Sequence, residues 1–291
     1  MAGLLKVGFR IEAMFNLVAV CCYDDYESGC TAGVGKLMNV VMLPSGHGPE
    51  GVSQFLTSFV IDGTVAIDAG SLGFQEELQF QRGVRDVFLT HAHVDHIASL
   101  PIFLETVYSP TGTPPTIYSL PETWDAIHRH IFNDVLYPDF IRLSAEGHLI
   151  LRWQALTPCQ PVAAAHLRLT PIAVHHAITT VGYIIEDDKS AIAFVTDTGP
   201  STEIWRKCAK TPNLRAVFLE CAFPTSLHWL ADRAGHMSAD QMPAELAKIG
   251  RDVPVYTIHI KPNFRPKILE ELIELGAANL HICEPGKAYQ F

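Results

Sequence analysis

The chain has 291 residues, of which 48% are hydrophobic, and its mean hydropathy of +0.17 is enough for a large core without disulfides. Its 21 Lys and Arg against 31 Asp and Glu give a formal net charge of −10, which argues against a broad nucleic-acid surface, because such surfaces need clustered basic residues. The seven cysteines form no Cys-x-x-Cys pair, which indicates reduced thiols in the cytoplasm and no thiolate metal site.

Residues 1–36 are predicted to be an N-terminal extension outside the catalytic core, with the fold beginning at Leu37. Lys6 and Arg10 precede a mostly apolar run, 13–22, which resembles a weak signal peptide. An acidic residue at its edge and the lack of an Ala-x-Ala-like cleavage site favour a cytoplasmic protein, with export left open. The run is too short to span a membrane.

The rest of the chain alternates apolar runs with turn-forming residues, and no break divides it, so we predict one domain over residues 37–291. The predicted strands cover 37–43, 55–61, 64–68, 87–90, a run from 117, 167–174, 181–186, 191–196, 217–220, 255–258 and 280–283. The predicted helices cover 97–108, 202–210, 239–249 and 266–275. Asp62-Gly63 predicts a hairpin turn, and Pro101 should lie in a first helical turn.

Residues 121–160 are predicted to be an irregular, mainly helical insertion that carries several aromatic side chains. Strands followed by helices on both outer faces favour a sandwich of two sheets flanked by helices, which is an α/β fold.

The most informative segment is His91-Ala92-His93-Val94-Asp95-His96, which directly follows the apolar run at 87–90. His91 and His93 are two residues apart, so both point the same way if the backbone stays extended. Asp95 and His96 follow where the chain turns into a helix and can face a second ion. Imidazole nitrogens suit zinc, and a shared carboxylate suits a pair of ions. Solvated loop residues would be the plain alternative, but three histidines in this spacing disfavour it.

This His-x-His-x-Asp-His string resembles the signature of the metallo-β-lactamase fold superfamily. The resemblance implies a four-layer αββα sandwich and a centre with two divalent ions, for which we expect Zn²⁺, with Mn²⁺ or iron as alternatives. His176 lies six residues before Gly182-Tyr183, as a ligand histidine does in the ribonuclease Z-like branch. Asp197 resembles the family's bridging strand-end carboxylate, and a plain helix-capping Asp is its alternative.

His259 ends the apolar strand 255–258 and would complete the set, although taken alone it would be a core histidine. The resemblance therefore implies two sites that share one carboxylate. Site 1 contains His91, His93, His176 and Asp197, and site 2 contains Asp95, His96, Asp197 and His259.

Two further residues are predicted to support the ligands from outside. Asp68 resembles the family's strand-end Asp that hydrogen-bonds a ligand, with a plain turn residue as a nearly equal alternative. His175 is predicted to pack beside the site or to support a ligand.

Two ions about 4 Å apart can generate hydroxide at neutral pH and hold both oxygens of an in-line displacement, which suits phosphodiester hydrolysis by a metal-bound hydroxide. Asp95 is expected to serve catalysis as well as metal binding. Glu220 and His236 resemble the pattern of the phosphodiesterase branch in which a strand-end Glu and a later His flank the substrate phosphate. The resemblance implies that His236 donates a proton or stabilises charge on a phosphoryl oxygen, and that Glu220 orients it. The alternative for His236 is a helix-capping role.

The segment from Ile258 to Pro262 resembles the His-x-Lys-Pro stretch of class II cyclic-nucleotide phosphodiesterases, and residues 131–140 resemble part of that family's insertion. The implied substrate is 3′,5′-cAMP or cGMP, hydrolysed to the 5′-monophosphate. Lys261 would hold the phosphate, Asn133 would hydrogen-bond the substrate, and aromatics of the insertion would stack on the base. Solvated or helix-ending roles are equally open for Lys261 and Asn133.

Three other functions stay open. A ribonuclease Z-like enzyme would need a basic arm, which is not evident, and a hydrolase of other esters or lactams would not need the pair Glu220 and His236. A metal-binding regulator without turnover is the third. The expected partner is a small nucleotide substrate, with no stable nucleic-acid partner and no membrane, and a homodimer is left open.

Overall fold

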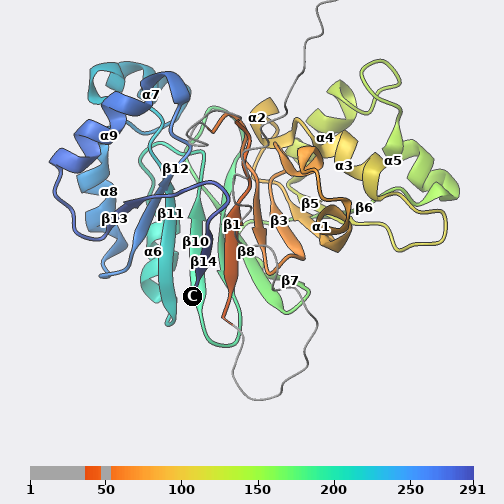
Figure 1. Cartoon of the computed structure of the whole chain (residues 1–291), viewed down its shortest axis with the longest axis horizontal. Coiled ribbons are helices and arrows are strands. Elements are labelled where there is room, and N and C mark those ends of the chain that lie inside the picture. The colour runs from red at the N-terminus through yellow and green to blue at the C-terminus, as the bar shows by residue number, and fades with distance from the viewer. Residues whose placement is uncertain (1–36, 47–53) are drawn as a thin grey trace, which may run out of the picture. The chain divides into compact units, whose positions relative to one another are not determined.

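The computed structural model of the protein describes residues 37–46 and 54–291, so the prediction for residues 1–36 lies outside the described residues. Within this part, two seven-stranded sheets lie face to face, with helices on their outer sides (Figure 1). The first sheet has the order β14 (Ala288–Gln290), β1 (Asn39–Met42), β2 (Phe59–Ile61), β3 (Val65–Ile67), β4 (Asp86–Phe88), β5 (Thr116–Ser119) and β6 (Arg152–Ala155). The second has the order β13 (Leu280–Ile282), β12 (Val255–Ile258), β11 (Leu214–Glu220), β10 (Ala191–Val195), β9 (Val181–Glu186), β8 (Leu167–Ala173) and β7 (Val162–Ala164).

Helices cover the outer face of each sheet. Those beside the first sheet are α1 (Leu78–Gly83), α2 (Val94–Ile97), α3 (Leu100–Val107), α4 (Pro121–His130) and α5 (Phe140–Leu143). Those beside the second are α6 (Glu203–Lys210), α7 (His228–Ala234), α8 (Met242–Ile249) and α9 (Arg265–Glu274). The predicted four-layer sandwich is therefore confirmed. None of the helices in the described residues has the length and apolar character that a membrane crossing requires.

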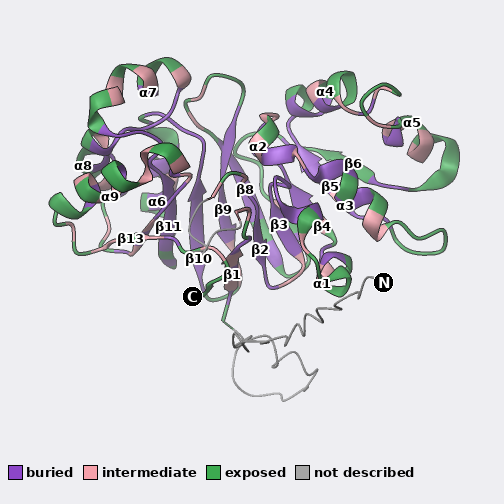
Figure 2. Ribbon diagram, turned by 45° about the horizontal axis from the view of Figure 1, so that its top comes forward, coloured by how far each residue is buried: buried purple, intermediate pink, exposed green. Residues whose placement is uncertain are grey.

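Strand β10 shows why a sheet of the sandwich needs an apolar layer on each of its faces. Its five residues are all buried, since alternate side chains face opposite sides of a sheet that is covered twice. Ile192 and Phe194 belong to the core between the sheets, whereas Ala193 and Val195 belong to the core under the helices. Figure 2 shows the same distribution, with buried strands inside and exposed residues on the helices and loops.

The predicted hairpin between β2 and β3 is confirmed. Asp62 and Gly63 are the left-handed central residues of the turn, with φ angles of 50° and 71°, and the Thr64 N–H closes it on the Ile61 carbonyl at 3.1 Å.

Two local predictions need correction. The helix expected over 97–108 is α3, which begins at Leu100 with Pro101 in its first turn, and a separate short helix, α2, precedes it from Val94 to Ile97. Residues 121–160 contain helices α4 and α5, but they also contain β6, which pairs with β5. This part of the chain therefore belongs to the first sheet and is not a mainly helical insertion throughout.

Phe194→Ala should lower the free energy of unfolding by about 3–5 kcal/mol, because it leaves a cavity between the sheets. The Phe194 ring is 0% exposed and meets Phe59 edge to face with centroids 4.4 Å apart. Phe74, which is 51% exposed, supplies the control, and Phe74→Ala should cost less than about 1 kcal/mol. Denaturant unfolding of both variants measures the difference, and equal losses would contradict this description of the core.

Candidate metal centre

The candidate ligands all follow strands at one edge of the sandwich. The segment from His91 to His96 follows β4 and forms the start of α2, while Asp197 and His259 follow β10 and β12. Because β10, β11 and β12 are parallel, their carboxyl ends lie at the same edge, near α2 and α7 in Figure 1. The fold thus gathers side chains that are up to 168 residues apart in the chain.

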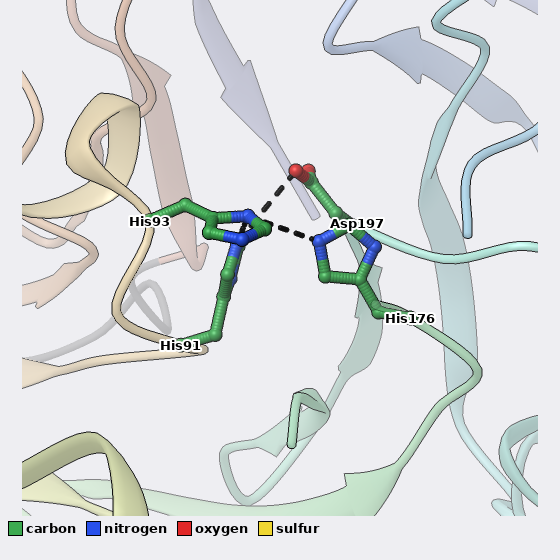
Figure 3. A group of neighbouring side chains, drawn as sticks. All are labelled: His91, His93, His176 and Asp197. Atoms are coloured by element: carbon green, nitrogen blue, oxygen red, sulfur yellow. Dashed lines mark hydrogen bonds and ion pairs between the residues drawn. The ribbon is translucent and has the colours of Figure 1, made fainter. Parts of the chain in front are cut away.

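The first group consists of His91, His93, His176 and Asp197 (Figure 3). The Nε2 atom of His91 lies 3.0 Å from Nδ1 of His93, which lies 3.1 Å from Nε2 of His176. Oδ2 of Asp197 is 3.7 Å from Nε2 of His91. One donor atom from each residue therefore points at a common centre.

The second group consists of Asp95, His96, Asp197 and His259. The Nε2 atoms of His96 and His259 each lie 3.3 Å from Oδ2 of Asp197. Oδ2 of Asp95 is 4.0 Å from Nε2 of His96 and 3.8 Å from Nε2 of His259. The same oxygen of Asp197, a residue that is 1% exposed, faces both groups.

The outer ring nitrogen of four of these histidines is held by a neighbour, so that the inner nitrogen faces the centre. Asp68, predicted to support a ligand, accepts from His96 Nδ1 at 2.7 Å and from the backbone N–H of Thr90 at 2.8 Å. The other three contacts join His91 to Thr90 Oγ1 at 2.9 Å, His176 to the Gly235 carbonyl at 2.7 Å, and His259 to Thr57 Oγ1 at 3.3 Å. Such contacts fix the ring orientation and the tautomer of metal-binding histidines.

Thr57, Thr90 and Gly235 were missed by sequence reasoning. Only Thr90, between the strand and His91, carried a local signal. Gly235 ends α7 with a φ of 68°, and a Cβ there would lie 2.8 Å from Cα of His176. A glycine is therefore needed for the close approach that lets its carbonyl reach the His176 ring.

Two buried nitrogens show that the groups fit cations. Nε2 of His96 and Nε2 of His259 make no hydrogen bond within the described residues, although each lies near the Asp197 carboxylate. A buried nitrogen without a hydrogen bond is costly. A borderline-soft divalent ion in the second group would satisfy both nitrogens, because it would be bound by two imidazoles and two carboxylates. The first group offers three imidazoles and one carboxylate to such an ion.

Four of the five candidate histidine ligands, all except His96, have pKa values that favour metal binding. Burial is the main cause that lowers the pKa of His91, His93 and His176, and it lowers the pKa of His259 to about 3. A lowered pKa means that the neutral imidazole, which is the ligating form, dominates at neutral pH.

His96 and Asp197 behave as an ion pair in the structure. Burial opposes the charge on His96, but the carboxylates of Asp197 and Asp68 outweigh burial and raise its pKa well above the usual value. Burial likewise opposes the charge on Asp197, but His259 and His96 hold its pKa well below the usual value. The buried carboxylate is thus ionised and demands positive charge beside it.

Glu220 and His236 form a hydrogen-bonded pair beside the first group, where the His236 ring lies 4.8 Å from the His176 ring. Nδ1 of His236 lies 2.9 Å from Oε1 and 3.1 Å from Oε2 of Glu220, and 4.0 Å from Oδ2 of Asp197. Glu220, the last residue of β11, is fully buried and also accepts the backbone N–H of Thr198. Burial lowers the pKa of His236, but the Glu220 carboxylate outweighs it, so the net pKa is raised.

Lys261 also reaches the cluster, since its Nζ lies 3.3 Å from Oδ2 of Asp95. Asn133 is engaged within its own turn: its side-chain nitrogen donates to the Arg129 carbonyl, and its side-chain oxygen accepts the N–H groups of Val135 and Leu136. These contacts fit the helix-ending alternative, and a contact of Asn133 with substrate stays a prediction.

His175 is exposed, and its backbone rather than its ring makes the contacts. Its N–H donates to Ser201 Oγ at 3.1 Å, and its carbonyl accepts from Gly199 at 2.7 Å. The ring forms no hydrogen bond with a ligand within the described residues. The residue supports the loop that follows Asp197.

Comparison with known proteins agrees with this arrangement. The family described as Beta-lactamase superfamily domain matches residues 64–260. A probable 3′,5′-cyclic-nucleotide phosphodiesterase of Yersinia pestis is 25% identical over an alignment of 338 positions, which covers 100% of this chain and 96% of that protein. The 3′,5′-cyclic-nucleotide phosphodiesterase 1 of Saccharomyces cerevisiae is 27% identical over an alignment of 193 positions, which covers 58% of this chain and 51% of that protein.

Two solved structures share the fold. Unliganded yeast PDE1 superposes with a TM-score of 0.72 at 21% identity, covering 88% of this chain and 100% of that chain. The short form of human tRNase Z gives a TM-score of 0.62 at 15% identity, covering 87% and 98%. The family match spans more than half of this chain and includes every candidate ligand from His91 to His259. The predicted family is therefore confirmed, and the chain belongs to the beta-lactamase superfamily.

Proposed function

We propose that this protein is a metal-dependent phosphodiesterase that hydrolyses 3′,5′-cyclic nucleotides to 5′-monophosphates. The observation that carries the proposal is the Asp197 carboxylate, whose Oδ2 faces both ligand groups and lies 4.0 Å from His236. The names of the curated relatives support the substrate class. The net charge of −10 favours a small nucleotide over RNA as substrate.

The two ligand groups would each hold one divalent cation. Zn²⁺ suits the imidazole-rich donor set best, and Mn²⁺ or iron would also be accepted by such a set. When bound, the cations would lower the pKa of water and neutralise charge on the phosphodiester. Asp197 would bridge them, and Asp95 would contribute its carboxylate only to the second.

His236 would supply the proton that the leaving oxygen needs. Glu220 holds Nδ1, which leaves Nε2 of the same ring to face the substrate. A raised pKa keeps more of the imidazole protonated near neutral pH, and a protonated imidazole can act as a general acid. Glu220 orients the ring and stabilises its positive charge.

Lys261 would pair with a phosphate oxygen. Its side chain is 31% exposed and is held toward the cluster by Asp95. With Lys261 beside the second group and His236 beside the first, positive charge lies on two sides of the place where a phosphate would bind.

The direct test is hydrolysis of 3′,5′-cAMP by zinc- or manganese-loaded protein, with the product separated and identified. We expect 5′-AMP, and no turnover by a His91→Ala/His93→Ala variant, because two ligands of the first group are lost. Absence of product from cAMP and cGMP, together with cleavage of RNA or a bis-aryl phosphodiester, would contradict the proposed substrate class.

Asp197→Ala should abolish metal binding at both sites, because one carboxylate serves both groups. The bound metal per chain, measured by elemental analysis after dialysis, should fall from two ions to fewer than one. Asp187→Ala, in a turn away from the cluster, is the matched control and should retain two. Two ions bound to the Asp197→Ala variant would refute the bridging role.

His236→Ala should keep both ions and lose about 10²- to 10⁴-fold in kcat, as removal of a general acid does. His130→Ala provides a control at an exposed histidine of α4, and its kcat should be unchanged. Steady-state kinetics and metal content are measured on the same preparations. A kcat within twofold of the unaltered enzyme would remove His236 from the mechanism.

A further inference from the structure

A cyclic nucleotide has a flat base as well as a phosphate, and three of the aromatic side chains predicted to hold that base are buried in the fold. Phe132 is 0% exposed and Phe140 is 8% exposed, with their rings stacked at 5.5 Å. Trp124 is buried and stacks on Trp153 with centroids 5.2 Å apart. Phe132, Phe140 and Trp124 therefore offer little exposed surface on which a base could lie.

A different aromatic pair lies next to the phosphate-handling residues. The Phe223 ring lies 5.8 Å from the His236 ring, and the Phe264 ring lies 5.9 Å from Phe223. Within the described residues, Phe223 is the one aromatic ring other than histidine that contacts a ring of the cluster. A base must lie beside the phosphate site and not in it, because the sugar separates the two, and these rings lie beside His236.

The two rings differ in what they can offer. Phe223 is 8% exposed, and its backbone is fixed by hydrogen bonds with Met237 and Ala239, so it forms a rigid wall. Phe264 is only partly buried. Its N–H donates to the Lys261 carbonyl at 3.0 Å, so one short turn carries both the predicted phosphate-binding lysine and a partly exposed ring.

We propose that Phe264, backed by Phe223, is the surface on which the nucleobase lies, an inference that rests on the proposed function. The turn from Lys261 to Phe264 would then recognise both ends of the substrate, with an ammonium for the phosphate and a ring for the base. Aromatic rings bind any base by stacking, and such contacts are sequence-tolerant. The surface therefore favours nucleotides over diesters that lack a base, without choosing between adenine and guanine.

The test compares two competitive inhibitors of cAMP hydrolysis that differ only in the base, 5′-AMP and ribose 5-phosphate. Phe264→Ala should raise the Ki of 5′-AMP and the KM of cAMP by about 5- to 100-fold, the range of one base–aromatic contact. The Ki of ribose 5-phosphate and kcat should change by less than about twofold. Phe264→Trp, which keeps a stacking surface, should leave the Ki of 5′-AMP equal or lower.

Trp229→Ala is the matched control, because Trp229 is 64% exposed on α7 and contacts no ring of the cluster. It should leave both Ki values unchanged. A Phe264→Ala variant that weakens both inhibitors equally, or neither, would overturn the proposal while the enzyme still hydrolyses cAMP. A base-selective loss in the Trp229→Ala variant would also overturn it. Absence of cAMP hydrolysis by the unaltered protein would instead overturn the proposed function, and the base surface with it.

Discussion

The buried carboxylate of Asp197 is the constraint on which the candidate centre depends. Its Oδ2 lies within 3.7 Å of Nε2 atoms from His91, His96 and His259, and 1% of the residue is exposed. An ionised carboxylate removed from water is costly unless positive charge surrounds it. In the structure His96 supplies part of that charge, and two divalent cations would supply it fully. The histidines around Asp197 therefore supply only part of the positive charge that its buried carboxylate requires.

The sandwich provides this arrangement by ending several buried strands at one edge. Apolar side chains on both faces of β10 fix the strand, so the residue that follows it has little freedom of position. Asp68 and His259 both have left-handed backbones, with φ angles of 60° and 55°. Non-glycine residues adopt such angles at an energetic cost. The core must therefore stabilise these two turns, of which one places His259 in the second group and the other places Asp68 behind the His96 ring.

Much of this could be predicted from the sequence, because the ligands follow recognisable strands. The six-residue segment from His91 is local, and Asp197 and His259 each end an apolar run. Tertiary partners could not be predicted in the same way. Thr57 meets His259 across 202 residues, and Gly235 meets His176 across 59, so no local pattern connects them. The local hydrogen bonds of Asn133 were also not evident from the sequence, although they lie within its own turn. Nor could the burial of Phe132 and Phe140 be predicted, because composition cannot distinguish a packed ring from one open to a ligand.

The most direct measurement of the central claim is anomalous X-ray diffraction from crystals of the zinc-loaded protein. The account predicts two zinc peaks, both within bonding distance of Asp197. One should be surrounded by His91, His93 and His176, and the other by Asp95, His96 and His259. A single peak, or two peaks of which only one touches Asp197, would contradict the shared carboxylate and with it the dinuclear centre.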